Sequence, residues 1–357
     1  MTTTNTRKLF IVLTGVSGNL GDAVIRRRIL SWVRGTGEVH AYLGRTTPGW
    51  VEQIGLTEDE HAYDAGSRKR WLKELVFGRG PRAWIFDPGE VPLGRAHLKS
   101  ELVFLAIAVL VRLRGGKIIR PPRAIGEYDR VVGLLYRWSA RLSQEVLWRD
   151  EASLALMKVG KLVPDTAFSE PRVQGLPFAE RKTIIVSLRG KRPYPTPAWF
   201  EAVRTFADET GFRVNVVSQV DEDEVRSAEV AAELGDAVAD YLPWGERSDA
   251  EQEKYVRDLY ESTALVISDR LHVLILAAQA GAIPTEAVIS PKPKVEQHFL
   301  VAGYPGPTLD TAQATAPQIV AFLHQQLGRS AELDAALASA AARLHLEITR
   351  IRAILQR

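Results

Sequence analysis

The chain has 357 residues, a length that predicts two domains at roughly 150 residues per domain. Hydrophobic residues make up 46% of it and charged residues 25%, proportions that exclude a disordered chain, a collagen-like chain and a polytopic membrane protein. The absence of cysteine excludes disulfides, Cys-ligated zinc, iron–sulfur clusters and a thiol nucleophile, and a net charge of +3 excludes a chain that binds nucleic acid through its overall charge.

Short apolar runs alternate with helical segments along the first half of the chain. The run at 9–13 (LFIVL) is typical of a strand buried on both faces, and glycines at 15, 18 and 21 separate it from a helical segment at 23–33. Strand, glycine loop and helix together predict the start of a β-α-β unit. Further strands are predicted at 39–43, 83–86, 117–120 and 145–148. Helices are predicted at 100–114, at 123–143 and from Asp150, where carboxylates occupy the first turn.

The same alternation begins again after 169–180, a segment rich in Pro, Gly and charge that predicts a domain boundary near residue 170. Strands are predicted at 182–188, 213–219 and 265–268, with a last strand at 283–289. Helices are predicted at 199–210, 255–263 and 270–280, and through the Ala- and Leu-rich tail from 312. This order predicts an α/β protein with domains at 1–170 and 171–330 and a C-terminal helix at 331–357. Such domains bind ligands at the carboxyl ends of their strands, usually in the cleft between them.

Nothing in the sequence is typical of a secreted or membrane-spanning protein. Residues 1–8 are polar and lack the apolar core of a signal peptide. The longest apolar stretch, 102–111, is shorter than the roughly 20 residues that cross a bilayer, so it predicts a helix that is buried or lies at an interface. We therefore expect a cytoplasmic protein.

A glycine-containing loop, residues 14–22, follows the first strand. Glycine lets a ligand approach the backbone closely, and a helix N-terminus favours an anion. The spacing of Gly15, Gly18 and Gly21 is not that of a dinucleotide-binding loop, and Asp22 at the helix start would cap the free N–H groups and repel phosphate. A tight turn and a ligand-binding loop fit this pattern equally well.

The segment Ser268-Asp269-Arg270-Leu271-His272 lies where a buried strand ends and an apolar helix begins. From that position Arg270 and His272 are expected to project into the cleft. A guanidinium binds a carboxylate or phosphate with two hydrogen bonds, and histidine transfers protons near neutral pH. The alternative is that Arg270 pairs with Asp269 while His272 caps the helix, which is the commoner role of an isolated Arg-x-His.

Two more arginines follow predicted strands. Arg149 lies just ahead of the helix at 150, and Arg189 follows the first strand of the second half. Each alone is expected to be a surface or ion-pair arginine. Together with Arg270 they give three guanidinium groups at strand ends of an α/β fold, which predicts a site for a small polyanion.

The acidic run at 221–224 (DEDE) follows a strand and can be interpreted as the Asp-x-Asp that holds a metal and a nucleotide sugar. Four consecutive acids are more often a solvated turn. We favour the solvated turn, so no metal site is predicted.

Basic residues flank the apolar helix; they are Arg112, Arg114, Lys117, Arg120 and Arg123. They are compatible with a solvated surface and with a patch that binds anionic lipid. The solvated surface is the favoured interpretation.

Short motifs between residues 18 and 295 together resemble the polysaccharide pyruvyl transferase family. In order they are Gly18-Asn19-Leu20-Gly21-Asp22, Arg149-Asp150-Glu151-Ala152-Ser153, Pro164-Asp165-Thr166-Ala167-Phe168, Ser187-Leu188-Arg189, Ser268-Asp269-Arg270-Leu271-His272 and Pro293-Lys294-Val295. The Arg-Leu-His element after Arg-Asp-Glu-Ala-Ser is the most specific part of the match.

The resemblance implies two Rossmann-like domains facing across a cleft, as in glycosyltransferases of the B type. It also implies transfer of a pyruvyl group from phosphoenolpyruvate, on the C-terminal side, to two hydroxyls of a sugar on the N-terminal side. The products are a cyclic ketal and phosphate, and the reaction needs no metal or cofactor. His272 is then the acid/base, while Arg270 and Arg149 bind the donor anion. Further substrate-binding residues implied in the same way are Arg189, Leu271, Lys294, Gly18, Asn19 and Asp22.

The chemistry of these residue types agrees with that reaction. Phosphoenolpyruvate carries a carboxylate and a phosphate on one small frame, which clustered arginines suit. Protonating its methylene carbon creates an oxocarbenium-like centre that a sugar hydroxyl attacks, and a protonated histidine can supply that proton or protonate the leaving phosphate. The sequence leaves two questions open: whether the sugar acceptor is linked to a lipid, and whether the protein contacts the inner face of the membrane as a peripheral protein.

Two other classes of function remain alternatives. A nucleotide-sugar glycosyltransferase on the same fold would use the arginines as diphosphate ligands and His272 as a helix-end residue. A catalytically silent sugar-binding or scaffold protein would use the C-terminal helix to bind a partner. Arg and His at a strand end favour an enzyme, because such groups are costly to bury without a polar ligand.

Overall fold

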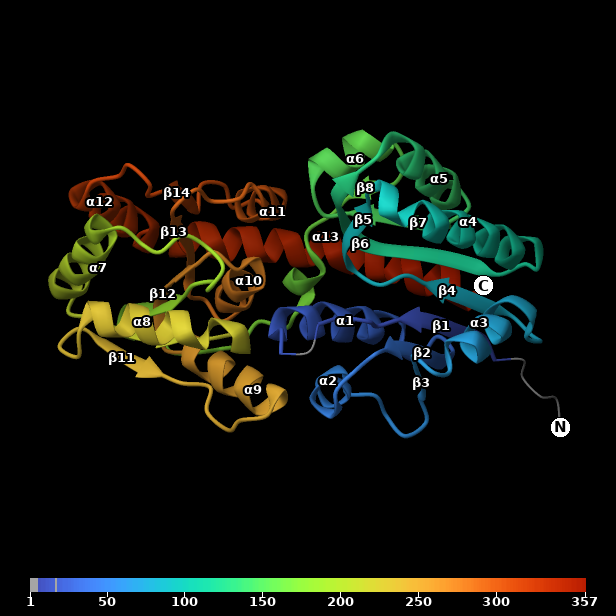
Figure 1. Ribbon diagram of the computed structural model, residues 1–357, viewed down its shortest axis with the longest axis horizontal. Helices are drawn as coiled ribbons and strands as arrows, with labels where there is room; N and C mark the ends of the chain where they lie inside the picture. The colour runs from blue at the N-terminus through green and yellow to red at the C-terminus, as the bar shows by residue number, and fades with distance from the viewer. Residues whose placement is uncertain (1–5, 17) are drawn as a thin grey trace. The chain divides into compact units, whose positions relative to one another are not determined.

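The computed structural model describes residues 6–16 and 18–357 and divides the chain into two compact units (Figure 1). The first unit comprises Met1–Ser17, Asp22–Ser169 and Ala342–Arg357, and the second comprises Gly18–Gly21 and Glu170–Ala341. The C-terminal helix α13 (Ser330–Gln356) therefore contributes its first part to the second unit and its last part to the first. The acceptor and donor roles expected for 1–170 and 171–330 stay predictions.

The first unit is built on a parallel sheet in the order β3-β2-β1-β4-β6-β7-β8, with β5 paired to β6. The strands are β1 (Lys8–Val12), β2 (Glu38–Gly44), β3 (His61–Asp64), β4 (Arg82–Ile85), β5 (Gly89–Leu93), β6 (Lys117–Tyr128), β7 (Glu145–Trp148) and β8 (Lys161–Leu162). A parallel sheet is covered on both faces, so neighbouring residues such as Phe10 and Ile11, which point to opposite faces, are both fully buried.

The end of α13 and the following α-helices make up the rest of the first unit as far as its residues are described: α1 (Leu20–Val33), α2 (Pro48–Ile54), α3 (Arg68–Phe77), α4 (Leu98–Leu113), α5 (Arg130–Arg141) and α6 (Glu151–Met157). An aromatic cluster fills one side of the sheet, where the rings of Trp84 and Phe86 stack 4.1 Å apart. The end of α13 belongs to this core, because Ile351 and Leu355 are buried and Arg352 Nη1 donates a hydrogen bond of 3.0 Å to the Trp32 carbonyl.

The second unit contains a parallel sheet in the order β11-β10-β9-β12-β13-β14. Its strands are β9 (Thr183–Ser187), β10 (Arg213–Val217), β11 (Ala239–Leu242), β12 (Thr263–Ser268), β13 (Ile283–Val288) and β14 (Thr308–Asp310). Counted within the unit, this is the 3-2-1-4-5-6 order of a Rossmann fold. The strand order reverses between β9 and β12, and such folds bind ligands at the carboxyl ends of the strands beside that reversal.

Some of the helices of the second unit begin at side-chain caps. The helices of this unit are α7 (Pro197–Thr210), α8 (Glu224–Leu234), α9 (Asp249–Tyr260), α10 (Leu271–Gln279), α11 (Lys294–Ala302) and α12 (Ala316–Leu327). The Thr196 side chain accepts a hydrogen bond from an amide in the first turn of α7, and Ser248 with Glu251 forms a capping box at α9. In α10, every residue except His272 is buried.

The predicted α/β class is confirmed, but three element predictions are wrong in part. The helix predicted at 123–143 begins late, because β6 continues to Tyr128 and α5 starts at Arg130, capped by the Asp129 side chain. The strand at 283–289 is not the last, since the three-residue β14 follows it. The helix predicted at 255–263 starts earlier, at Asp249, and residue 263 already belongs to β12.

Helix α4 contains the long apolar stretch of the sequence. Across residues 6–16 and 18–357, no helix is long and apolar enough to cross a membrane.

Candidate active site

Two loops at the reversal of the second sheet are bound to each other. β9 ends at Ser187 and β12 at Ser268, and the Ser268 hydroxyl donates a hydrogen bond of 2.5 Å to the Ser187 carbonyl. Just beyond, the Arg189 amide donates to Oδ1 of Asp269 at 3.0 Å. The parallel register therefore places two of the predicted site arginines, Arg189 and Arg270, on adjacent loops.

Arg270 is only 9% exposed, and it is held by a buried carboxylate at the end of the 3-10 helix Asp221–Asp223, which leads into α8. Its Nε lies 2.5 Å from Oδ2 of Asp223, and its Nη2 contacts the same oxygen. Oδ1 of Asp223 accepts a hydrogen bond of 2.9 Å from the Gly190 amide. The carboxylate of Asp223 thus fixes both the guanidinium of Arg270 and the loop after β9. The alternative in which Arg270 pairs with Asp269 is wrong, because its ion-pair partner is Asp223.

The acidic run at 221–224 is therefore not a solvated turn throughout. Asp221 and Glu222 are exposed, as that prediction requires. Asp223 is buried, and burial raises the pKa of its carboxyl while the charge of Arg270 acts against that rise. The solvated-turn prediction is wrong for Asp223, because an arginine from a distant part of the chain supplies its counter-charge.

Arg192 adds a second guanidinium beside Arg189. Their Nε atoms lie 3.6 Å and 3.8 Å from the same oxygen, Oδ2 of Asp269. Both arginines line a small pocket whose walls also include Asp269, Trp199 and Thr311. A third of the Arg189 side chain remains exposed, so this group is placed to meet a ligand.

The side chain of Arg226 binds the backbone of the loop that follows β9. Its Nη2 donates to the Gly190 carbonyl at 3.0 Å, and its Nη1 donates to the Arg192 carbonyl at 3.1 Å. With it, four guanidinium groups lie around this loop; Asp223 and Asp269 are the buried carboxylates among them, and the exposed Glu229 and Glu222 lie beside Arg226 and Arg270. Guanidinium groups concentrated at strand ends suit a small polyanion.

The buried carboxyl of Glu286 lies near Arg189 and Arg192 but does not neutralise their charge. Glu286 of β13 is 1% exposed, and burial raises its pKa to about 8, with Asp269 adding to the rise. Its Oε2 accepts a hydrogen bond of 2.9 Å from the Thr308 hydroxyl. Glu286 is therefore mostly protonated at neutral pH and leaves the arginines their positive charge.

His272 lies in the first turn of α10, with the glycine loop packed against it inside the second unit. A Cβ placed on Gly21 would lie 2.4 Å from the Cβ of His272, so a larger residue cannot stand there. Gly18 has a φ of 75°, and its amide donates to Asp249 at 3.2 Å. Asn19 forms an antiparallel bridge with Val220. These glycines therefore serve close packing against protein groups, and a ligand role for the loop stays a prediction.

Two other predicted substrate residues lie in the second unit. Leu271 is buried in the core at the start of α10, and Lys294 is half-buried as the first residue of α11. Asp22 belongs to the first unit, where it forms an ion pair of 3.5 Å with Arg26 and accepts a long hydrogen bond from the Val16 amide. Their roles toward a substrate stay predictions.

Arg149 lies at the carboxyl end of β7 in the first unit and is 2% exposed. Its Nη1 lies 2.5 Å from Oδ2 of Asp165, so two of the short family motifs meet as a buried ion pair. Asp150 beside it caps α6 by accepting a hydrogen bond of 2.7 Å from the Ser153 amide. In the described part of the chain, Arg149 Nε is buried and has no hydrogen-bond partner.

The basic segment around β6 is partly buried, which corrects the prediction of a solvated surface. Arg120 and Arg123 are buried because β6 runs through the interior of the sheet. Arg120 lies over the Phe86 ring at 4.0 Å, and Arg123 Nη2 donates to Asp87 Oδ1 at 3.0 Å.

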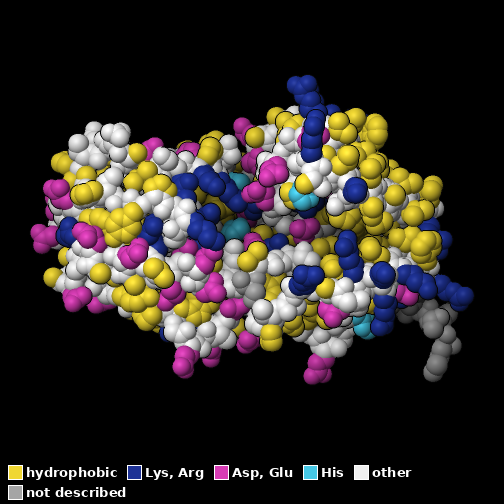
Figure 2. Space-filling model, in the orientation of Figure 1, with side chains coloured by type: hydrophobic (Ala, Val, Ile, Leu, Met, Phe, Trp, Pro, Cys, Tyr) yellow, Lys and Arg dark blue, Asp and Glu magenta, His cyan; other side chains and the backbone are white. Residues whose placement is uncertain are grey.

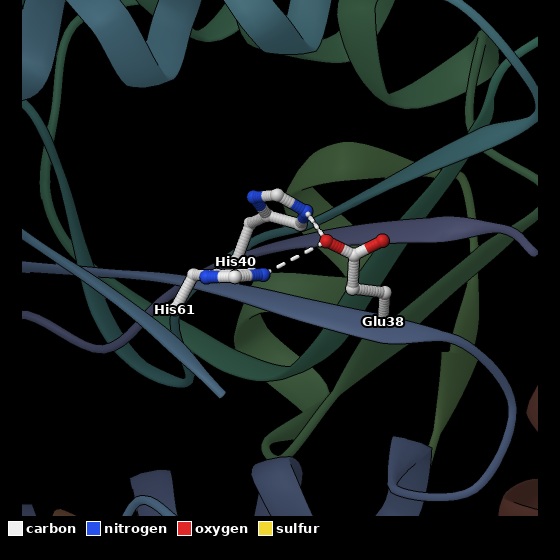
Figure 3. Close-up of side chains that lie close together, drawn as sticks. All are labelled: Glu38, His40 and His61. Carbon is white, nitrogen blue, oxygen red and sulfur yellow. Dashed lines mark hydrogen bonds and ion pairs between the residues drawn. The ribbon is translucent and has the colours of Figure 1, made fainter. Parts of the chain in front are cut away.

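The sequence analysis did not predict a cluster of Glu38, His40 and His61 in the first unit (Figure 3). Nε2 of His40 and Nε2 of His61 lie 3.0 Å and 2.9 Å from the same oxygen of Glu38, and Nδ1 of His40 lies 3.0 Å from the Tyr63 hydroxyl. The three donor atoms lie within 4.8 Å of one another, a set that suits a zinc-like cation. The groups also satisfy one another by hydrogen bonds, and pairing between β2 and β3 brings them together, so no motif along the chain predicts them.

Comparison with known proteins agrees with the motifs. A family model described as polysaccharide pyruvyl transferase matches residues 19–282. No curated protein matches the chain.

Solved structures resemble the chain over nearly its whole length. A candidate UDP-N-acetylglucosamine 2-epimerase from Listeria monocytogenes is 11% identical with a TM-score of 0.59, and the match covers 96% of both chains. MurG from Acinetobacter baumannii is 12% identical with a TM-score of 0.50, covering 98% of this chain and 99% of MurG. The glycotransferase of kitacinnamycin is 14% identical with a TM-score of 0.50 and covers 98% of both. At these identities the likeness establishes the fold, which is glycosyltransferase-B-like.

Proposed function

Because the chain belongs to the polysaccharide pyruvyl transferase family, we propose that it moves the pyruvyl group of phosphoenolpyruvate onto two hydroxyls of a sugar. The acceptor is a sugar of a polysaccharide or glycolipid precursor, and the products are a cyclic ketal and inorganic phosphate. The observation that carries the proposal is the arginine cluster at the sheet reversal of the second unit, where Arg189, Arg192 and Arg270 are held around two buried carboxylates.

The cluster supports binding of a small, multiply charged donor. Arg270 cannot swing away, because Asp223 holds its Nε and Nη2, so its orientation toward a ligand is set before binding. Arg189 is partly exposed and supplies a second guanidinium. The donor-binding role of Arg149 is part of the proposal, and the ion pair with Asp165 fixes the position of its guanidinium.

In the proposed reaction, the protonated imidazole of His272 gives a proton to the methylene carbon of the donor. The C=C bond becomes a methyl group, and one sugar hydroxyl adds to the central carbon and loses its proton. The C–O bond to phosphate then breaks, the second hydroxyl adds and loses its proton, and the ketal closes. The two sugar hydroxyls lose two protons in total. One of these protons replaces the proton that His272 gave to the methylene carbon, and the other leaves on hydrogen phosphate. His272 supports this role by being the residue of α10 that is not buried.

Phosphate release from phosphoenolpyruvate in the presence of a panel of sugar acceptors tests the proposal. The expected result is acceptor-dependent phosphate and a new methyl singlet of the ketal in the proton NMR spectrum of the product. Phosphoenolpyruvate should also raise the melting temperature, whereas nucleotide sugars should not. Protection by nucleotide sugars with release of nucleotide, and no ketal, would instead establish the glycosyltransferase alternative.

A further inference from the structure

Helix α4 exposes apolar side chains where a surface helix normally carries charge. Its exposed stripe includes Leu102, Val103, Val109, Leu110 and Leu113, at helical spacing, and Leu113 is 79% exposed. The opposite side of the helix is buried in the first unit. A helix that is apolar on both sides and yet half exposed marks an interaction surface.

Helix α5 packs beside α4 and extends the same surface. Val131, Leu134 and Trp138 are exposed on it at a spacing of three and four residues, and Trp138 is 48% exposed. Figure 2 shows hydrophobic side chains gathered over the region of these two helices, with Lys and Arg at its margins. We call the eight residues Leu102, Val103, Val109, Leu110, Leu113, Val131, Leu134 and Trp138 the α4–α5 face.

The exposed charged residues of α4 and α5 themselves are positive. Lys99 lies before its first apolar residue on α4 and Arg114 just after the helix, and both are exposed. Exposed Arg130 and Arg141 occupy the two ends of α5. Within these two helices the one acidic residue, Glu101, is buried. An apolar strip with cations at its ends matches a bilayer whose headgroups are anionic.

We propose that the α4–α5 face lies on an anionic phospholipid membrane, with α4 and α5 in the plane of the interface. Leu and Val side chains enter the acyl boundary, Trp138 takes the interfacial position that its ring prefers, and the cations contact headgroup phosphates. A second copy of the chain fits this face less well, because a two-fold contact would bring the positive ends of both copies together. The inference goes beyond the proposed function, and its test uses no substrate.

Flotation of the full chain with vesicles tests the proposal. Vesicles of phosphatidylcholine with 40% phosphatidylglycerol are compared with pure phosphatidylcholine at roughly 0.1 M salt, where charge interactions are still felt. Binding is expected on the anionic vesicles and should weaken as salt rises. Leu113→Glu should lower the bound fraction at least tenfold, and Arg130→Gln with Arg141→Gln about fivefold per charge. Leu346→Glu, at a residue of α13 that is 69% exposed, is the matched control and should bind like the wild type.

A second measurement locates the contact. Because the chain has no cysteine, Leu113→Cys and Leu346→Cys can each carry a single environment-sensitive fluorophore. Anionic vesicles should shift the emission of the label at 113 to the blue and leave the label at 346 unchanged. Equal binding to both vesicle types, equal responses of the two labels, or no vesicle binding together with a dimer that Leu113→Glu dissociates would each overturn the proposal.

Discussion

Replacing Asp223 by Asn should destabilise the second unit specifically. The substitution keeps the shape of the side chain but removes its charge. In the wild type, Oδ1 accepts from the Gly190 amide while Oδ2 pairs with Arg270. An amide has one oxygen, so it can serve one of these donors and must turn its own NH₂ toward the other.

The size of the effect follows from burial. Asp223 is 2% and Arg270 9% exposed, so the variant leaves a guanidinium in the interior without its counter-charge. Removing one partner of a buried pair costs about 3–5 kcal/mol. For a unit of this size each kcal/mol lowers the melting temperature by about 2–4 °C, so the fall should be at least about 6 °C.

Scanning calorimetry of the full chain, without phosphoenolpyruvate, measures the loss, because a bound ligand would mask it. Glu222→Gln is the matched control: this neighbour is half exposed and lies 3.8 Å from Arg270 Nη2, so its removal should cost less than about 1 kcal/mol. If Asp223→Asn melts within a degree or two of Glu222→Gln, the pair does not hold the two loops together and the anchoring of Arg270 is refuted.

Variants at three further residues test the site itself. Arg270→Lys keeps the charge but loses the planar guanidinium that can contact Asp223 and a ligand at the same time, so the KM for phosphoenolpyruvate should rise about ten- to a hundredfold, since a charged hydrogen bond is worth about 1.5–3 kcal/mol; unchanged donor kinetics would remove Arg270 from the pocket. His272→Ala should lower turnover about 10²–10⁴-fold while phosphoenolpyruvate still protects the fold against heat; His272→Gln should do little better, and near-normal turnover would end its role as acid/base. Glu286 has a folded pKa of about 8 against 4.5 unfolded, so its stabilising effect is full below pH 4.5 and is lost as the pH rises through 8. The melting temperature of Glu286→Gln should therefore fall less than that of the wild type between pH 5 and 8.5, and parallel curves would contradict the raised pKa.

Local signals explain what the sequence predicted well. The carboxylates at 150–151 indicated a helix start, and Asp150 does cap α6, which begins at Glu151. The buried run ending at Ser268 indicated a strand followed directly by a helix, and β12 and α10 are separated by two residues. Both features depend on residues that are close together in the chain, so the sequence pattern alone is enough to predict them.

Partners distant in sequence explain what could not be predicted. Nothing among four consecutive acids distinguishes Asp223, whose partner lies 47 positions later. Glu286 follows Thr285 in an ordinary strand, and only the assembled sheet buries it beside the arginines. Strand β6 contains the run Arg120-Pro121-Pro122-Arg123, which has no apolar period, because ring contacts and an ion pair replace apolar burial there.

The division of α13 between the units has a consequence for synthesis on the ribosome. The first unit includes Ala342–Arg357, so its core lacks Ile351 and Leu355 until almost the whole chain has been made. The interval between its two parts is about 170 residues, on the order of ten to thirty seconds of translation. The second unit, apart from Gly18–Gly21, is continuous, so it does not depend on residues 342–357 to complete its core. A released chain truncated after residue 341 should therefore show a protease-resistant second unit beside a protease-sensitive first one.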